Sequence, residues 1–304
     1  MMMNSNEISL FISKGLKRLP HAEGIARRYN RRRHEAIERE IRPLCEKVQK
    51  SLIDAVPAVR SETRNDGPIW VFWWQGEIAA PRVVRVCIET MREHGANRDV
   101  VIITKDNIRE YCNLPDYIYE KVDNHNITLT HLSDIVRFNL LHNHGGLWMD
   151  ATLYVANSLN NDRCFDSFYT CSGFDDPTNF FVTEGKWTGF FMGGSADEPL
   201  FQFMNSFFLC YWKANSELID YFLIDYVLRY AYEHRIGSLW NWTKAQTGKD
   251  NPKLFDLASL MVKEFDLTVW ERLTSDTCVF KLSWKKPKSF PRGSFGDVLI
   301  NQFA

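Results

Sequence analysis

The apolar residues of the chain recur at two spacings, which predicts strands and helices in turn. Residues 69–76, Ile-Trp-Val-Phe-Trp-Trp-Gln-Gly, form a near-continuous apolar and aromatic run, typical of a central strand buried on both faces. Pro81 begins a predicted helix over 81–95, and residues 100–104 form a second strand. Strand, helix and strand at this spacing predict a right-handed βαβ unit in an α/β fold.

Residues 131–152 predict a helix followed directly by a buried strand. Ser133 is the expected N-cap, an apolar stripe at helical spacing follows it, and Gly145 ends the helix. Residues 147–149, Leu-Trp-Met, form a short strand that brings Asp150 to its carboxyl end. Ligands of α/β sheets bind at that end of the strands.

Three polar side chains are therefore expected to converge at this edge of the sheet. Asp134 and Arg137 lie three residues apart on one helix face, and Asp134 is expected in the first turn, where the helix dipole favours an anion. Asp150 joins them from the strand. Spacing alone also allows a second interpretation, since such an Asp–Arg pair is often a solvated ion pair and a lone Asp after a strand is often a turn residue.

The remaining segments predict further elements on both sides of this centre. We expect a long amphipathic helix over 24–55, a boundary at Gly67-Pro68, a short helix from Lys105, strands at 153–155, 164–174 and 188–194, and helices over 197–212 and 218–234. The chain is thus predicted to contain an amino-terminal basic helical region, residues 1–65, and an α/β domain, residues 66–304.

Charge is unevenly distributed, although the formal net charge of the 304 residues is only −1. Residues 1–50 contain twelve Lys and Arg but six Asp and Glu. Two interpretations stay open: a solvated helical arm, or a surface that makes peripheral contact with anionic lipid at the inner face of the membrane. Nothing else in the sequence indicates nucleic acid as a partner.

Composition bounds the class of protein and its compartment. A chain with 45% hydrophobic residues can form one large globular domain, alone or with additions. The seven cysteines show no spacing typical of zinc or redox sites, so we expect buried thiols in a reducing compartment. There is no run of about 18 apolar residues and no signal-peptide pattern at the start, so we expect a cytoplasmic protein.

Several enzyme classes lack their sequence motifs here. No Gly-x-Gly-x-x-Gly follows the first strand and no Gly-Lys-Ser/Thr loop occurs, which argues against a dinucleotide-dependent oxidoreductase and a P-loop ATPase. The triplet Asp150-Ala151-Thr152 has a superficial likeness to the nucleophile loop of haloacid-dehalogenase-type phosphatases. That loop needs a second Asp, which this chain does not have.

One larger pattern resembles a known family. Ser133-Asp-Ile-x-Arg137, then Leu140-Leu141, then Gly145-Gly-x-Trp-x-Asp-Ala-Thr152 resembles the capsular polysaccharide synthesis proteins. These are bacterial relatives of the glycosyltransferases that include yeast initiating mannosyltransferases and, more distantly, the clostridial glucosylating toxins. The resemblance covers roughly residues 66–290 and implies a GT-A-like, Rossmann-type nucleotide-sugar-binding domain with additional helices.

The resemblance also implies roles for the three converging residues. Asp134 and Arg137 would bind hydroxyls of the donor sugar, and Asp150 would bind a divalent metal, Mn²⁺ or Mg²⁺, or the ribose. The wider group has Asp-x-Asp at the metal position, whereas this chain has Ala151 followed by Thr152. The capsular subgroup resembles this chain in having Asp-Ala-Thr, so the missing carboxylate is a subgroup trait.

Two further segments carry roles implied by the resemblance. An aromatic side chain after the first strand would stack on the nucleotide base, which makes Trp73, Trp74 and Gln75 candidates, with core packing of either Trp as the alternative. Phe280-Lys281-Leu-Ser-Trp resembles a His-Lys-Leu segment that closes over the diphosphate. Because Phe280 stands where His is common, a second metal ligand is missing there, and Lys281 is a candidate to take part of the cation's role at the diphosphate as a point charge; an ordinary surface lysine is the alternative.

These implications give one expected function and one alternative. The chain is expected to be a nucleotide-sugar-dependent hexosyltransferase that retains anomeric configuration and acts on a saccharide or lipid-linked saccharide acceptor. Asp225 is either a group that contacts the acceptor or a surface carboxylate. The alternative is a non-catalytic nucleotide-sugar-binding or assembly protein that has lost full metal binding.

Overall fold

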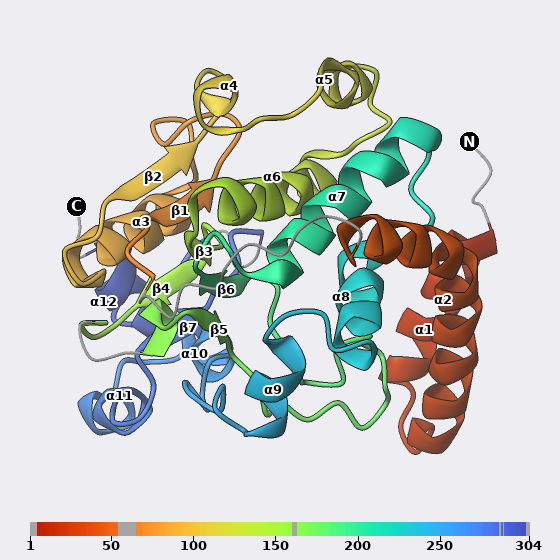
Figure 1. Ribbon diagram of the computed structural model, residues 1–304. Helices are drawn as coiled ribbons and strands as arrows, with labels where there is room; N and C mark the ends of the chain where they lie inside the picture. Colours follow the sequence, from red (N-terminus) through yellow and green to blue (C-terminus); the bar gives the residue numbers. More distant parts are fainter. Residues whose placement is uncertain (1–4, 54–64, 160–162, 286, 288, 302–304) are drawn as a thin grey trace.

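A mixed five-stranded sheet, in the order β2-β1-β3-β6-β5, forms the centre of the computed structural model (Figure 1), which describes residues 5–53, 65–159, 163–285, 287 and 289–301. β1 pairs in parallel with β2 and β3, while β6 runs antiparallel to β3 and β5. The α/β fold expected from the sequence is confirmed. The strands are β1 (Ile69–Phe72), β2 (Val100–Ile103), β3 (Gly146–Met149), β5 (Phe168–Thr170) and β6 (Phe191–Gly194).

Alternate side chains of the strands enter two hydrophobic cores, because successive residues of a strand point to opposite faces. Ile69 and Val71 of β1 pack with α3 (Arg82–His94), whereas Trp70 belongs to the core beneath α6 (Leu129–His144) and α7 (Pro199–Ala214). Both faces of the sheet are therefore covered, as the apolar run of the first strand predicted.

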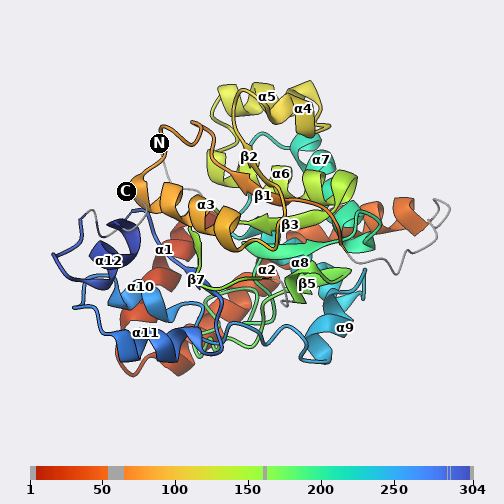
Figure 2. The same cartoon turned by 90° about the vertical axis from the view of Figure 1, so that its left-hand side faces the viewer.

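A second sheet of two strands carries the carboxyl-terminal part of the chain toward the first. β4 (Leu153–Val155) pairs antiparallel with β7 (Val279–Lys281), which places Lys281 opposite Leu153. Figure 2 shows α10, α11 and α12 grouped at one end of the molecule and α4 and α5 beside β2. The remaining helices are α4 (Ile108–Tyr111), α5 (Asp116–Asp123), α8 (Leu223–Glu233), α9 (Leu239–Lys244), α10 (Asp256–Leu260), α11 (Leu267–Thr274), α12 (Phe295–Asn301) and the 3₁₀ helix η1 (Arg163–Phe165).

Three predicted strands are shorter in the structure. The run 69–76 leaves the sheet after Phe72, because a turn closed by a Gly76 N–H to Trp73 carbonyl bond of 3.0 Å follows. Over 164–174 only β5 is extended, and η1 precedes it, whereas over 188–194 the strand begins at Phe191. The apolar and aromatic runs therefore predicted where these strands lie, but predicted them longer than they are.

The helix of the central stretch begins one turn earlier than predicted. Thr128, not Ser133, is its N-cap, with extended backbone angles and a side chain that accepts a hydrogen bond from the His131 N–H. Ser133 donates instead to the Thr130 carbonyl. Asp134 consequently lies in the second turn, where the helix dipole contributes less than the prediction assumed. Gly145 ends the helix at φ 65°, as predicted.

The two amino-terminal helices pack against the part of the chain that follows residue 65. α1 (Ser5–Arg18) and α2 (Glu23–Ile53) lie side by side (Figure 1), and apolar residues of α2 such as Ile37 and Ile41 are buried in the core that contains α7 and α8. Residues 54 and 55 of the predicted helix lie outside the described part of the chain. Arg33 is not solvated as the charge pattern suggested, because it is buried in an ion pair with Asp220.

Two further observations concern the cysteines and the described helices. Of the seven cysteines, five are buried as expected, Cys278 is half-buried and Cys210 is exposed, which corrects the expectation for that residue. Among the described helices, none combines the length and the apolar character needed to cross a bilayer.

Candidate functional site

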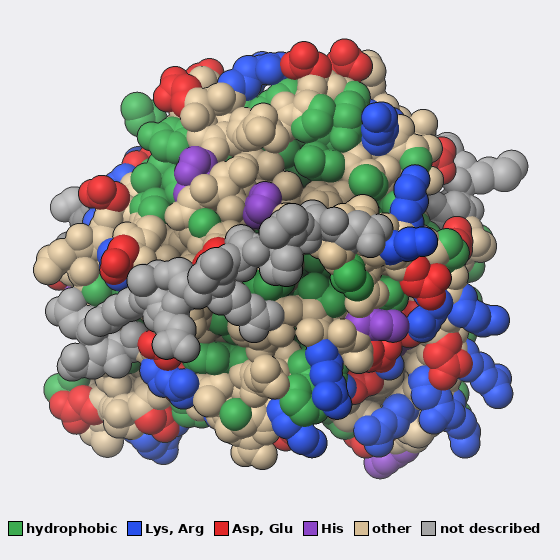
Figure 3. Space-filling model, viewed as in Figure 1, with side chains coloured by type: hydrophobic (Ala, Val, Ile, Leu, Met, Phe, Trp, Pro, Cys, Tyr) green, Lys and Arg blue, Asp and Glu red, His purple; other side chains and the backbone are tan. Residues whose placement is uncertain are grey.

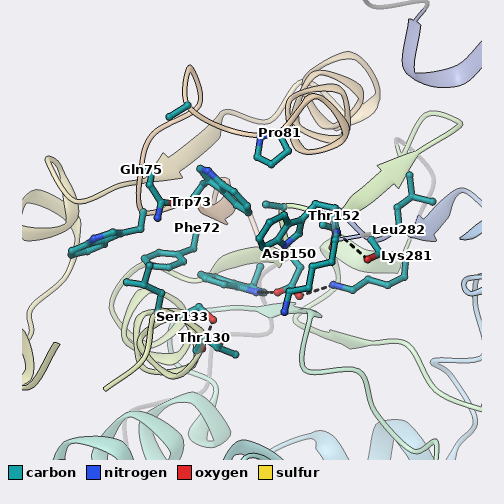
Figure 4. Close-up of a pocket in the computed structure, with 18 residues that line it drawn as sticks. Phe72, Trp73, Gln75, Pro81, Thr130, Ser133, Asp150, Thr152, Lys281 and Leu282 are labelled. Carbon is teal, nitrogen blue, oxygen red and sulfur yellow. Dashed lines mark hydrogen bonds and ion pairs between the residues drawn. The ribbon is translucent and has the colours of Figure 1, made fainter. Parts of the chain in front are cut away.

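Asp150 lies at the carboxyl end of β3, where three donors surround its carboxylate. Lys281 Nζ of β7 lies 2.6 Å from one carboxylate oxygen, and the Trp148 indole donates to the other over 3.0 Å. Arg137 Nη2 lies 3.4 Å from that second oxygen. Figure 4 shows the Asp150 carboxylate with the Lys281 side chain pointing toward it. The Asp150 side chain keeps 30% of its exposure and so faces that cavity.

Arg137 joins the helix to the strand. Its guanidinium lies 3.2 Å from Asp134 Oδ1 on the same face of α6 and stacks over the Trp148 ring with 4.9 Å to the centroid. The side chains of Arg137 and Asp134 are nearly buried. Within the described parts of the chain, Arg137 Nε has no hydrogen-bond partner. The structure therefore brings Asp134, Arg137 and Asp150 together, as their spacing predicted.

Burial and neighbouring charges shift the pKa values of Asp134 and Asp150 in opposite directions. Burial raises the pKa of Asp134 to about 7, although Arg137 opposes the shift. For Asp150, burial acts upward too, but the charges of Lys281 and Arg137 outweigh it and hold the pKa below its ordinary value. Asp150 is thus a carboxylate fixed between two cations, and Asp134 is a proton-exchanging group close to neutral pH.

A cavity of about 720 Å³ opens beside Asp150, between the end of β1 and the segment after β7. Trp73, Trp74 and Gln75 line its wall, as Figure 4 shows for Trp73 and Gln75. The Trp73 ring meets Trp284 edge to face, with 5.6 Å between centroids. Both Trp73 and Trp74 are half-buried, so each combines core packing with an aromatic surface that faces the cavity.

A second cavity, of about 480 Å³, lies on the other side of Asp150. Aromatic side chains form much of its wall, and Asp225 of α8 accepts a hydrogen bond of 3.0 Å from the Trp187 indole there. Burial raises the pKa of Asp225 to about 6. Thr130, Ser133 and Asp150 line both cavities, so the two spaces meet at the charged centre.

The groups around Asp150 do not match the ligand set of a divalent cation. Mg²⁺ and Mn²⁺ prefer several oxygen ligands, whereas among the described residues Asp150 is the one carboxylate that lines the 720 Å³ cavity, and Ala151 follows it. Lys281 and Arg137 occupy both of its oxygens with positive charge. No cluster of three or more potential metal-ligating side chains occurs among the described residues. The metal stays a prediction that this arrangement does not support.

Sequence reasoning missed several neighbours of the site. Trp148 and Asp150 are two residues apart, and this spacing places their side chains on one side of an extended segment. Their hydrogen bond could therefore have been predicted from the sequence. Trp187 and the cavity wall around it carried no such signal, because their partner Asp225 lies on a distant helix. Trp284 was visible only as the end of the segment that contains Lys281.

The α/β fold is consistent with a glycosyltransferase-like fold, and two cavities lie at the carboxyl edge of its parallel strands. A sequence model described as capsular polysaccharide synthesis protein matches residues 21–297. The chain therefore belongs to that family, which gives it a role in capsular polysaccharide synthesis. The match begins within the amino-terminal region and so includes all of α2. A search of curated proteins gave no match.

Proposed function

We propose that the protein is a nucleotide-sugar-dependent hexosyltransferase that acts on a saccharide acceptor in the synthesis of capsule or another surface polysaccharide. The position of Asp150 carries this proposal. Its carboxylate lies where the two cavities meet, and Lys281 and Arg137 both bind it. Two cavities joined at a charged centre suit a reaction between two bound substrates, since holding both in place lowers the barrier.

In this proposal the donor occupies the 720 Å³ cavity. Trp73 or Trp74 stacks on the base, and Gln75 at the same wall hydrogen-bonds the nucleoside. The diphosphate lies toward Lys281, and the sugar lies toward Arg137 and Asp134. The support is geometric, because the aromatic wall and the cationic floor lie at opposite sides of one cavity (Figure 4).

The transfer itself requires charge neutralisation and alignment. The bond between the anomeric carbon and the diphosphate oxygen breaks, and a bond from that carbon to an acceptor oxygen forms. Lys281 stabilises the negative charge that develops on the leaving diphosphate, while Arg137 and Asp134 hold the sugar. The acceptor hydroxyl passes its proton to a phosphate oxygen of the donor, so no protein base is needed. Retention of anomeric configuration rests on the family resemblance alone.

We assign the balancing charge to Lys281 instead of a divalent cation. Two cations already bind Asp150, and a metal at this carboxylate would have to displace Lys281 from its 2.6 Å contact. A lysine acts as a compact point charge and needs no further ligands, which suits a donor cavity to which the described residues contribute one carboxylate, Asp150. Donor turnover in the presence of EDTA tests this assignment directly.

The acceptor is proposed to occupy the 480 Å³ cavity. Its aromatic wall offers flat apolar surfaces for sugar rings, and Asp225, held by Trp187, offers an oxygen for a hydroxyl of the acceptor. A saccharide bound there reaches the anomeric carbon across Asp150, which lines both cavities.

Donor hydrolysis in the absence of acceptor tests the proposal. The protein is incubated with a panel of nucleotide sugars, with Mn²⁺, Mg²⁺ or EDTA, and the released nucleotide is measured. We expect slow hydrolysis of at least one donor, abolished by Asp150→Asn. Asp116→Asn is the matched control, because Asp116 is an exposed carboxylate paired with Arg109 outside both cavities, and it should keep the wild-type rate.

One observation favours an alternative, a non-catalytic nucleotide-sugar-binding or assembly protein: among the described residues, Asp150 is the one carboxylate that lines the proposed donor cavity. The same samples distinguish the two functions. A binding protein would show a higher melting temperature with one nucleotide sugar and release no nucleotide under any metal condition. An enzyme shows both effects.

A further inference from the structure

The outward face of α1 is apolar. Ile8, Phe11 and Ile12, spaced as neighbours on one helix face, keep 47%, 71% and 44% of their exposure. The opposite face is the one that packs, since Leu10 and Ser13 are buried there and Ser13 donates a hydrogen bond to Asn30 of α2. A helix packed on a protein usually turns polar residues outward. We call Ile8, Phe11 and Ile12 the α1 face.

Basic side chains are numerous in α1 and in the first half of α2, which packs against it. Residues 5–34 contain eight Lys and Arg but only two Asp and Glu. Figure 3 shows Lys and Arg side chains gathered at the lower right of the molecule, where Figure 1 draws α1 and α2. The exposed basic residues here are Lys14, Lys17, Arg18, Arg27, Arg28, Arg31 and Arg32.

We propose that the α1 face and its basic surroundings dock the protein on an anionic lipid bilayer. An interfacial helix has this combination of large apolar side chains with Lys and Arg at the border. Each basic residue close to an anionic surface adds to the attraction, and the apolar side chains add their burial among the lipid chains. The sequence left open a membrane contact through the basic residues 1–50, and this proposal assigns the contact to α1.

The charge of this surface favours lipid over a second copy of the chain. A two-fold symmetric dimer would place the same patch of each copy against the other. Arg18 and Lys14 at the border would then face their own counterparts, and like charges repel. An anionic bilayer offers the opposite charge to all of them at once.

The α1 face also lies next to the proposed acceptor cavity. Phe11 and Lys14 line a cavity of about 610 Å³ together with Tyr221, and Tyr221 also lines the 480 Å³ cavity. On the other side, Lys17 Nζ lies 4.3 Å from the ring centroid of Phe181, which lines the 480 Å³ cavity as well. If the proposed function holds, the docked protein presents its acceptor cavity beside the lipid headgroups, as a lipid-linked acceptor requires.

Binding to lipid vesicles tests the docking proposal without any nucleotide sugar, so its outcome is independent of the transferase assay. The full chain is floated with vesicles of phosphatidylcholine, or of phosphatidylcholine mixed with phosphatidylglycerol. We expect binding to the mixed vesicles only, weakened by salt. The double variant Phe11→Ser, Ile12→Ser should bind roughly 100-fold more weakly, since each apolar side chain left in water costs roughly tenfold.

The control variant is Leu267→Ser, which removes an equally exposed apolar side chain, 60% exposed, from the distant helix α11. It should bind like the wild type. The proposal would be overturned if the double variant bound the mixed vesicles as well as the wild type does, or if the wild type did not bind them. So would a wild-type dimer in light scattering that the double variant abolishes. Hydrogen exchange of the wild type gives a second readout that needs no variant: vesicles should protect the amides of residues 5–18, and unchanged exchange there contradicts docking.

Discussion

Replacing Lys281 with Met should remove the cation that faces the leaving diphosphate while it keeps a side chain of similar length. Lys281 Nζ lies 2.6 Å from Asp150 Oδ2, and its side chain is 21% exposed. Two unit charges about 4 Å apart interact by about 4 kcal/mol at an effective dielectric constant of about 20. Because the ammonium keeps some solvent contact, we take a lower value of about 2.7 kcal/mol, which is roughly 100-fold in kcat.

The assay is nucleotide release at saturating donor, measured with EDTA and again with Mn²⁺. Lys281→Met should lose roughly 100-fold in kcat under both conditions, and Lys281→Arg should keep most of the activity because it keeps the charge. Lys253→Met is the matched control. Lys253 forms a similar ion pair with Asp276, 2.7 Å long, and lines neither of the two proposed substrate cavities.

Two results would refute this reasoning. A wild-type rate for Lys281→Met, together with loss of activity of both proteins in EDTA, would show that a metal and not the lysine balances the diphosphate. An equal loss in Lys253→Met would show that breaking any Lys–Asp pair harms the protein. A circular dichroism melt of each variant separates such unfolding from a loss at the site.

Three further variants test other parts of the account. Trp73→Ala should raise the donor KM by roughly 5- to 100-fold with little change in kcat, as steady-state kinetics would show, because base stacking is lost. Arg33→Met should lower the free energy of unfolding by about 3–5 kcal/mol in urea, because it leaves Asp220 buried without its partner, whereas the exposed Arg31→Met should change it by at most about 0.5 kcal/mol. Between pH 3.8 and about 7, native Asp134 holds a proton that the unfolded chain has lost, so the wild type loses stability as the pH rises through this range. Asp134→Asn has no such group, so the melting temperature of the variant minus that of the wild type should increase over this range and stay constant above it. A difference that is constant with pH would contradict the raised pKa.

Local patterns predicted the centre of the fold. The apolar run at 69–76 located the central strand, and the glycines after the helix located the turn into β3, because both signals depend on neighbouring residues alone. Boundaries were less accurate. Thr128 caps the helix that Ser133 was expected to cap, since either hydroxyl satisfies the pattern and the backbone path before Leu129 decides between them.

Contacts between segments that are distant in the chain could not be predicted from the sequence. Lys281 reaches Asp150 only because β7 pairs with β4, and no spacing along the chain encodes that antiparallel register. Arg33 seemed to be one more solvated charge in a basic run, although its partner Asp220 lies buried under α2. The family resemblance supplied the candidate Lys281, whereas its ion pair with Asp150 came from the structure.

A crystal structure of the protein with a bound nucleotide sugar measures the central claim most directly. The account predicts the diphosphate against Lys281, the base at the Trp73 wall of the 720 Å³ cavity, and the sugar toward Arg137 with its anomeric carbon turned toward the 480 Å³ cavity. A diphosphate bound away from the Asp150 carboxylate, or a sugar that points out of both cavities, would contradict it.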